Sequence, residues 1–190
     1  VVGYKAPAHD IDAEVIDILE EQGYLYDASV YPSFFNPLLN ACYRVAGGGR
    51  PLGLGDWQCA FAPNRPYRLG RPYWRPGTRD LIEFPICQIP GVRFPFYATV
   101  MFVAGLGSFR LGLASVQCMS FVTYVFHSFD LLAEEDFGFD PVLRRYPALR
   151  LPLAQRLSMV DYAIGALAKR FRTVTYREAV LDPAIRDAIL

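Results

Sequence analysis

The sequence has no excess of charge of either sign. Nineteen Lys and Arg residues balance nineteen Asp and Glu residues among the 190, so the formal net charge is zero. A protein without a cationic field does not attract nucleic acid or an anionic membrane over long range. Because the 17 arginines are scattered along the chain without a run, we expect them on the surface and in ion pairs, and we expect no nucleic-acid partner.

Metal-ligating residues are scarce. His9 and His127 are the only histidines, and no two cysteines have the C-x-x-C spacing of a structural zinc site. Four cysteines in 190 residues are also too few for a disulfide scaffold, so we expect buried free thiols. The cysteines are Cys42, Cys59, Cys87 and Cys118.

Several common catalytic motifs are missing. The run Gly47-Gly48-Gly49 is not followed by Lys and Ser or Thr, so it does not form a phosphate-binding loop. No G-x-S-x-G sequence is present, which disfavours a serine hydrolase. The adjacent acids at 20–21 and 134–136 are expected on solvated surface, since they lie on a helix and in a polar connection.

The longest hydrophobic run does not predict a membrane span. Residues 94–129 carry only one charged side chain, Arg110, before the acidic stretch that follows. Roughly 20 apolar residues suffice to cross a bilayer, but glycines and serines divide this run into pieces that resemble buried strands of an α/β core. The chain opens with Val-Val-Gly-Tyr-Lys, without a basic segment or initiating Met, so we expect no signal peptide and an N-terminal truncation. Localisation stays open.

The first thirty residues predict a strand, a helix and a strand. Residues 1–4 form a short apolar run that ends before Pro7, which cannot continue a strand's hydrogen bonds. Residues 13–22 carry acids in the first turn and precede Gly23, as expected of a helix. Residues 24–30 have the composition of a strand.

The remainder predicts a single α/β domain with a long insertion. Residues 47–80 are rich in Gly, Pro and Arg and show no periodicity, so we expect an excursion loop. Its aromatic residues either line a sugar-binding groove or pin the loop onto the body of the protein, and the sequence favours neither. These residues are Trp57, Tyr67, Tyr73 and Trp74.

Further strands and helices follow this loop. Strands are expected at 81–86 and 121–126, and the second would place His127 at its carboxyl end. A helix with one buried stripe is expected from Leu153 to Phe171, then a strand at 173–175 and a helix at 177–181. The stripe consists of Leu153, Leu157, Val160, Ile164, Leu167 and Phe171.

The two histidines are the candidate groups for acid or base chemistry near neutral pH. His127 stands at a predicted strand end with Asp130 three residues later, and its functional and structural interpretations are equally open. His9 lies in a loop between strand and helix, where a polar residue more often faces water.

Several segments together resemble one family. The sequences Gly3-Tyr4-Lys5-Ala6-Pro7, Leu19 to Tyr24 and Tyr26 to Pro32 follow in order, then Leu81 to Pro85 and the Y-x-x-H-x-x-D-L pattern around His127. They resemble the polysaccharide deacetylases of the NodB-homology group, carbohydrate esterase family 4. The likeness covers most of the chain except residues 33–80.

The resemblance implies the later part of a distorted (β/α) barrel that removes acetyl groups from N-acetylated glycans. In that family a divalent metal, expected to be zinc, polarises the amide carbonyl and activates water. Its ligands come from an Asp-Asp pair and an H-x-x-x-H motif, and this sequence contains neither. We therefore expect a truncated chain that holds no metal tightly by itself, since three ligands are the usual minimum.

The resemblance also assigns roles to residues. Lys5 stands where the family has an arginine that holds the base carboxylate, and Asp27 stands at an aspartate near the site. His127 corresponds to the histidine that protonates the leaving amine, a step that suits the ordinary imidazole pKa of about 6.5. We expect His9, Pro7 and Trp74 to bind substrate.

A second hypothesis belongs to another class of protein. The chain is then a catalytically inactive NodB-like module that binds glycan or serves only as structure. Its lysine at the arginine position and its missing metal ligands favour this interpretation. The glycan, the activity and the oligomeric state stay open.

Overall fold

The computed structural model describes residues 1–35, 57–133, 136 and 147–190. The chain divides into two compact units, each described here by itself. Unit 1 comprises Val1–Pro95, Met119–Thr123 and Val174–Leu190. Unit 2 comprises Phe96–Cys118 and Tyr124–Thr173.

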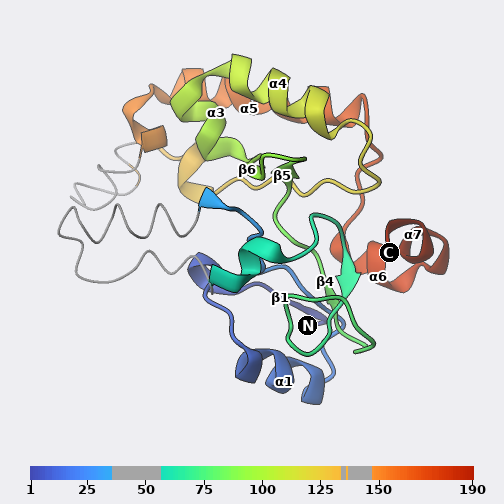
Figure 1. Ribbon diagram of the computed structural model, residues 1–190. Helices are drawn as coiled ribbons and strands as arrows, with labels where there is room; N and C mark the ends of the chain where they lie inside the picture. The colour runs from blue at the N-terminus through green and yellow to red at the C-terminus, as the bar shows by residue number, and fades with distance from the viewer. Residues whose placement is uncertain (36–56, 134–135, 137–146) are drawn as a thin grey trace. The chain divides into compact units, whose positions relative to one another are not determined.

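Unit 1 contains a four-stranded sheet with the order β1-β2-β4-β3, of which Figure 1 labels β1 and β4. Its strands are β1 (Gly3–Tyr4), β2 (Tyr26–Asp27), β4 (Ile82–Glu83) and β3 (Tyr67–Arg68). The pairs β1–β2 and β2–β4 are parallel, whereas β3 runs antiparallel to β4. A separate antiparallel pair consists of β5 (Gln88–Ile89) and β6 (Phe94–Pro95). The strands expected at 1–4, 24–30 and 81–86 are thus confirmed in position, although each is only two residues long.

The helix expected at residues 13–22 is confirmed as α1 (Ala13–Glu21). The side chain of Asp12 accepts a hydrogen bond from the Val15 amide at 2.9 Å, which satisfies one of the unpaired N–H groups of the first turn. Gly23 follows the helix with a φ of +74°, a conformation that costs glycine little. Helix α1 buries Ile16 and Leu19.

Apolar side chains cover both faces of the sheet. Leu81 and Tyr67 belong to a cluster that also contains the buried face of α1. Ile82 and Phe84 belong to a second cluster, together with side chains of the two C-terminal helices. Since successive strand residues point to opposite faces, the run 81–84 supplies both clusters. The C-terminal helices are α6 (Tyr176–Leu181) and α7 (Pro183–Ile189).

Residues 57–80 pack within unit 1 instead of forming the irregular excursion that we expected. This segment contains the short helix η2 (Trp57–Phe61) and β3, and both Tyr67 and Tyr73 are buried. Residues 47–56 of the expected loop lie outside the described part of the chain. The Tyr73 hydroxyl donates to the Ile11 carbonyl at 3.0 Å. The lack of periodicity did not mean a lack of packing, because these residues pack through isolated aromatic side chains and not along a helix or a long strand.

Unit 2 is helical where we expected buried strands. Helices α3 (Ala98–Ala104) and α4 (Leu106–Val116) occupy most of the long apolar run. Gly105, with a φ of +80°, separates them. Residues 121–126 form no strand, so the strand expected there is wrong. An apolar run without a clear period does not distinguish a buried helix from a buried strand.

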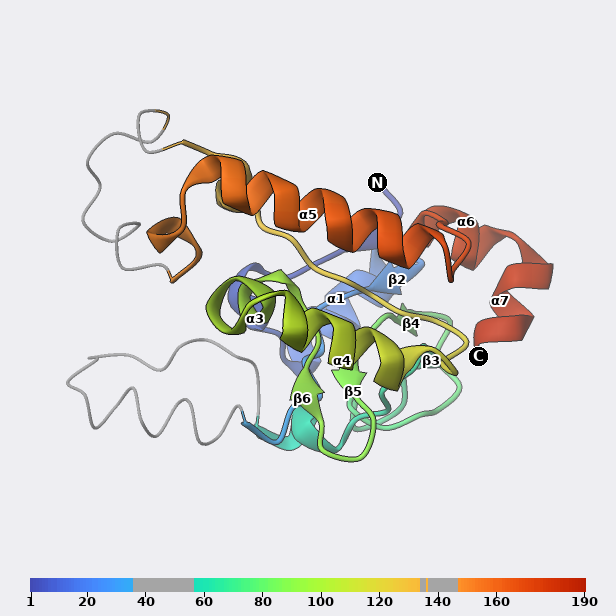
Figure 2. The same cartoon turned by 90° about the horizontal axis from the view of Figure 1, so that it is seen from above.

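The helix expected from residue 153 is confirmed as α5 (Leu153–Ala168), which runs along α3 and α4 (Figure 2). Its buried side differs from the predicted stripe, because Leu157 and Ile164 are exposed. The residues buried on α5 are Arg156, Met159, Val160 and Ala163. Val160 of the predicted stripe is buried, and the packed face otherwise consists of Arg156, Met159 and Ala163, which the stripe left out. The strand expected at 173–175 is absent, and Thr175 instead caps α6.

The structure is mixed α/β, and the sheets of its described residues do not close into a barrel. Two short helices, η3 (Ser128–Leu131) and η6 (Pro147–Arg150), complete unit 2, and η1 (Pro7–His9) follows β1 in unit 1. No helix in the described part of the chain combines the length and the apolar character needed to cross a membrane.

Candidate functional site

Charged side chains gather where the three parallel strands of unit 1 end. Lys5 directly follows β1, Asp27 ends β2 and Glu83 ends β4. Tyr4 is the register partner of Asp27, and Asp27 is the register partner of Glu83. Register partners in adjacent strands point to the same face, so the two carboxyl groups are neighbours. The carboxyl edge of a parallel sheet is where α/β proteins commonly place their sites.

Asp27 is fully buried and is held by the turn that follows it. The Ser29 hydroxyl donates to Asp27 Oδ1 at 2.6 Å, and the Ser29 amide donates to Asp27 Oδ2 at 3.1 Å. The same hydroxyl accepts from the Ala6 amide at 2.7 Å. Ser29 therefore links the loop after β1 to the carboxyl group at the end of β2.

Glu83 is also fully buried, and its carboxyl group lies beside that of Asp27, its register partner on β2. Its Oε1 atom accepts from the Val30 amide at 2.9 Å. Burial, followed by the neighbouring Asp27 charge, raises the pKa of Glu83 well above its ordinary value. Burial likewise raises the pKa of Asp27, although its hydrogen bonds oppose this effect.

Lys5 supplies the positive charge of the cluster. Its Nζ atom donates to the Ala28 carbonyl at 2.8 Å, while the residue as a whole keeps exposed surface. Desolvation lowers the pKa of Lys5, and the charges of Glu83 and Asp27 partly restore it. An ammonium group has three N–H donors, so two remain for other acceptors.

Pro7 and His9 lie next to this cluster on the short helix η1. His9 has a φ of +62°, and its Nδ1 atom is 3.2 Å from the Ser29 carbonyl oxygen. Because a carbonyl oxygen only accepts, the hydrogen of this bond lies on Nδ1. The His9 ring lies against Tyr31, with centroids 5.2 Å apart and the ring planes inclined by 30°. Pro7 is exposed at the start of η1.

His127 belongs to unit 2 and is positioned by Asp130. The His127 amide donates to Asp130 Oδ2 at 2.8 Å, and that oxygen lies 3.6 Å from His127 Nδ1. Asp130 is fully buried, whereas the His127 side chain is 36% exposed. Arg156 fixes this loop by donating to the carbonyl oxygens of Asp130 and Leu132, both at 2.7 Å. The sequence motif around His127 thus forms a compact turn with an accessible imidazole group.

The aromatic residues of 57–80 do not share one surface. Trp74 is half-buried against the α1 side of the core and lies 5.3 Å from Tyr73, ring to ring. Trp57 is 60% exposed and Phe61 is 65% exposed, with centroids 6.2 Å apart. Trp74 and Tyr73 therefore pin this segment to the body, as one of the two sequence interpretations held, while Trp57 and Phe61 face solvent.

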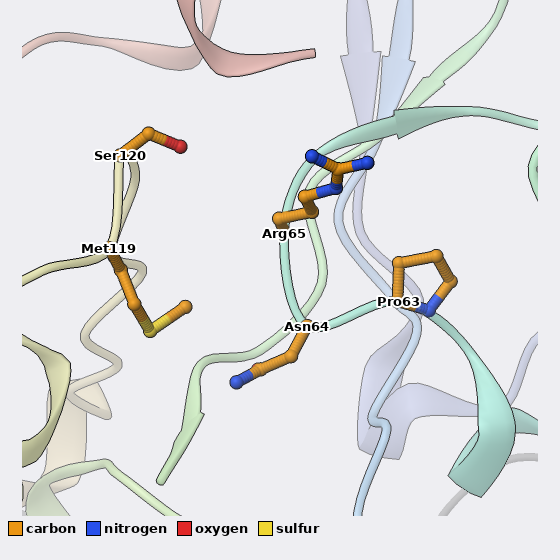
Figure 3. Close-up of a pocket in the computed structure, with 5 residues that line it drawn as sticks. All are labelled: Pro63, Asn64, Arg65, Met119 and Ser120. Atoms are coloured by element: carbon orange, nitrogen blue, oxygen red, sulfur yellow. The ribbon is translucent and has the colours of Figure 1, made fainter. Parts of the chain in front are cut away.

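A cavity of about 370 Å³ also lies in unit 1. Because β3 is antiparallel to β4, the residues before Tyr67 lead past the carboxyl end of β4. The Asn64 side chain is held by two hydrogen bonds to the Gln88 main chain, at 2.6 and 2.8 Å. Figure 3 shows Asn64 and Met119 reaching toward each other across this open space. The lining residues are Pro63, Asn64, Arg65, Met119 and Ser120.

The zinc that the sequence resemblance implies does not fit the described residues. No group of three or more His, Cys, Asp or Glu side chains among them could hold a metal ion. In the main cluster, both carboxyl groups are fully buried, and each accepts a hydrogen bond from a main-chain amide. No metal-dependent step is therefore derived from this geometry.

Sequence reasoning missed two members of the cluster, Ser29 and Glu83. Glu83 had a visible signal, because it is the only charged residue within the apolar segment 81–87. A charge inside a buried parallel strand requires a partner. Ser29 had no comparable signal, since serine is common after strands.

Comparisons with protein families, with curated proteins and with solved structures found no match for this chain.

Proposed function

We propose that this chain carries part of the site of a carbohydrate N-deacetylase, related to the NodB-like barrels that its sequence resembles. The supporting observation is that Lys5 bonds to Ala28, and His9 and Asp27 bond to Ser29, in the turn at the carboxyl edge of the parallel strands. The sequence resemblance assigned roles to Lys5 and Asp27, and His9 is one of the two histidines of the sequence. Their meeting in one turn is what supports the proposal.

In the proposed reaction, water adds to the carbonyl carbon of an N-acetyl group. The bond between that carbon and the sugar nitrogen then breaks, giving acetate and a free amine. Lys5 retains two N–H donors, which are available to oxygen atoms of the glycan. Asp27 has no exposed surface, so it cannot touch the glycan. Its role is to keep a negative charge beside the ammonium group of Lys5.

His127 is proposed to give the proton that the departing nitrogen requires. Its accessible ring and its contact with buried Asp130 are suited to a general acid, since the aspartate orients the imidazole group. The family's metal would supply water activation; this role is not assigned to any residue of this chain.

The test is the release of acetate from N-acetylchitooligosaccharides by the protein, compared with the variants His127→Ala and Lys5→Met. We expect each variant to lower turnover, by about 10²-fold or more for His127→Ala. Ser128→Ala, which changes an exposed neighbour of His127, is the matched control. Undiminished turnover in His127→Ala would exclude it as the general acid.

One observation favours the alternative of a glycan-binding module without catalysis. The described residues lack a metal-ligand set, while Trp57 and Phe61 expose aromatic rings on which a sugar can stack. Calorimetry with the same oligosaccharides distinguishes the two functions. Binding that weakens in Trp57→Ala, with no acetate released under any metal condition, supports the module and rejects the enzyme.

A further inference from the structure

The hydrogen bonds of the buried carboxyl pair are distributed unequally. Asp27 accepts from both the hydroxyl and the amide of Ser29, one on each of its two oxygens. Several donors directed at one carboxyl group stabilise its charged form. Lys5, whose ammonium group lies within the field of Asp27, adds to this preference.

Glu83 has the opposite arrangement. Only Oε1 accepts a main-chain hydrogen bond, from the Val30 amide. Its buried Oε2 atom accepts from no donor in the described part of the chain. A buried carboxylate oxygen without a donor is costly. The cost disappears if Oε2 carries a proton and donates it to the neighbouring carboxyl group of Asp27, the register partner of Glu83.

We propose that Glu83 is a positioning residue that carries a proton on Oε2 at neutral pH, donates it to Asp27, and so leaves Asp27 as the single buried negative charge beside Lys5. This proposal deepens the proposed function, and it depends on that function only for what the buried negative charge is used for. The state of the proton can be measured whether or not the protein is an enzyme.

The surrounding groups are consistent with this balance of charge. Besides Lys5, the pair has Tyr67 on its own face of the sheet, as the register partner of Glu83 on β3. Tyr176 on α6 packs against Phe84, on the opposite face, but lies within range of the charges of both carboxyl groups. Burial raises the pKa of Tyr67, and it raises the pKa of Tyr176 to about 12, so both are neutral near pH 7. One carboxylate and one ammonium group then cancel, whereas two buried carboxylates would leave an uncompensated charge.

Infrared spectroscopy of the protein in deuterated buffer tests the proposal. A protonated carboxyl group has a carbonyl stretching band that is separate from those of carboxylates and amides. We expect this band at neutral pH, and we expect carbon-13 labelling of the glutamate side chains to shift it. Because the labelled protein is otherwise wild type, the result does not depend on a variant that folds.

Variants then assign the band. Glu83→Gln should remove the shifted band, and Glu21→Gln, on the exposed surface of α1, should keep it. A band that does not move with glutamate labelling places the proton on an aspartate and overturns the proposal. Absence of any protonated carboxyl band at neutral pH overturns it as well. Failure of the acetate assay, in contrast, would reject the proposed function and leave this result standing.

A functional readout separates positioning from general structure. The amide of Glu83→Gln can donate to Asp27 and accept from Val30, whereas Glu83→Ala can do neither. We expect glycan affinity to fall about tenfold or more in Glu83→Ala and to be largely restored in Glu83→Gln. Equal loss in both folded variants would contradict the assigned hydrogen-bond direction.

Discussion

Ser29 is the residue whose replacement tests the candidate cluster most directly. Its hydroxyl group accepts from the Ala6 amide at 2.7 Å and donates to Asp27 at 2.6 Å, and the residue is fully buried. Ser29→Ala removes one atom and creates no clash. It leaves an unpaired buried N–H group and takes a donor from a buried carboxyl group, which together cost about 3 kcal/mol.

The measurement is urea unfolding followed by tryptophan fluorescence. Both tryptophans, Trp57 and Trp74, belong to unit 1, so the signal reports the unit that contains Ser29. With an unfolding slope of about 2 kcal/mol/M, the midpoint should fall by about 1.5 M.

The matched control for this measurement is Ser120→Ala. Ser120 is an exposed serine of unit 1, and its replacement should change stability by no more than about 0.5 kcal/mol. If Ser29→Ala lost less than about 1 kcal/mol, the hydroxyl group could not be making both bonds, and the cluster as described would be refuted.

Three further outcomes are expected. Burial raises the pKa of Glu83, so above the unfolded-state glutamate pKa of about 4.3 the folded state keeps a proton that the unfolded state loses, and the free energy of unfolding should fall as pH rises. Urea unfolding at a series of pH values should show a smaller fall for Glu83→Gln, and an equal fall in the variant would contradict the prediction. Lys5 and Lys169 are the only lysines, so carbon-13 NMR of labelled lysine can follow Lys5. The pKa of Lys5 should be lower in the folded than in the urea-unfolded protein, and lower still in Asp27→Asn, whereas a pKa raised by folding would refute the desolvation of Lys5. Arg156→Met should cost unit 2 about 2 to 4 kcal/mol by leaving buried carbonyl groups unpaired; circular dichroism should show the loss, and an unchanged midpoint would mean that these bonds contribute little.

The sequence predicted local structure where one physical cause dominates. Helix α1 followed from its acidic first turn and from Gly23, and both act within a few residues of the chain. The strand at residues 121–126 was wrong because composition alone does not show whether a neighbouring strand is available to pair. The packed face of α5 was wrong because Arg156 is buried by its bonds to carbonyl groups of distant loops, which no helical periodicity reveals.

The candidate site was predictable in part for a related reason. Lys5, Asp27 and His9 carry recognisable chemistry near the predicted ends of elements, and the structure brings them to one turn, where Lys5 bonds to Ala28 and the other two bond to Ser29. The contribution of Glu83 depends on the register Asp27↔Glu83 between β2 and β4. The two residues are 56 positions apart, and a shift of the register by one residue would place their side chains on opposite faces. Sequence patterning does not determine such a register.

Burial divides the cluster into two parts with different consequences. Asp27, Ser29 and Glu83 have no exposed surface, so their replacement must affect stability whatever the cluster does. Lys5 is exposed and His9 is half-buried, so only these two can meet a ligand. If the cluster were merely structural, loss of ligand binding would follow loss of stability across all the variants. If it is a site, Lys5→Met should weaken glycan binding while the midpoint of urea unfolding changes far less than in Ser29→Ala. The reason is that the buried carboxyl groups stabilise the fold, whereas the Lys5 ammonium group, which their negative charge stabilises, contacts the ligand.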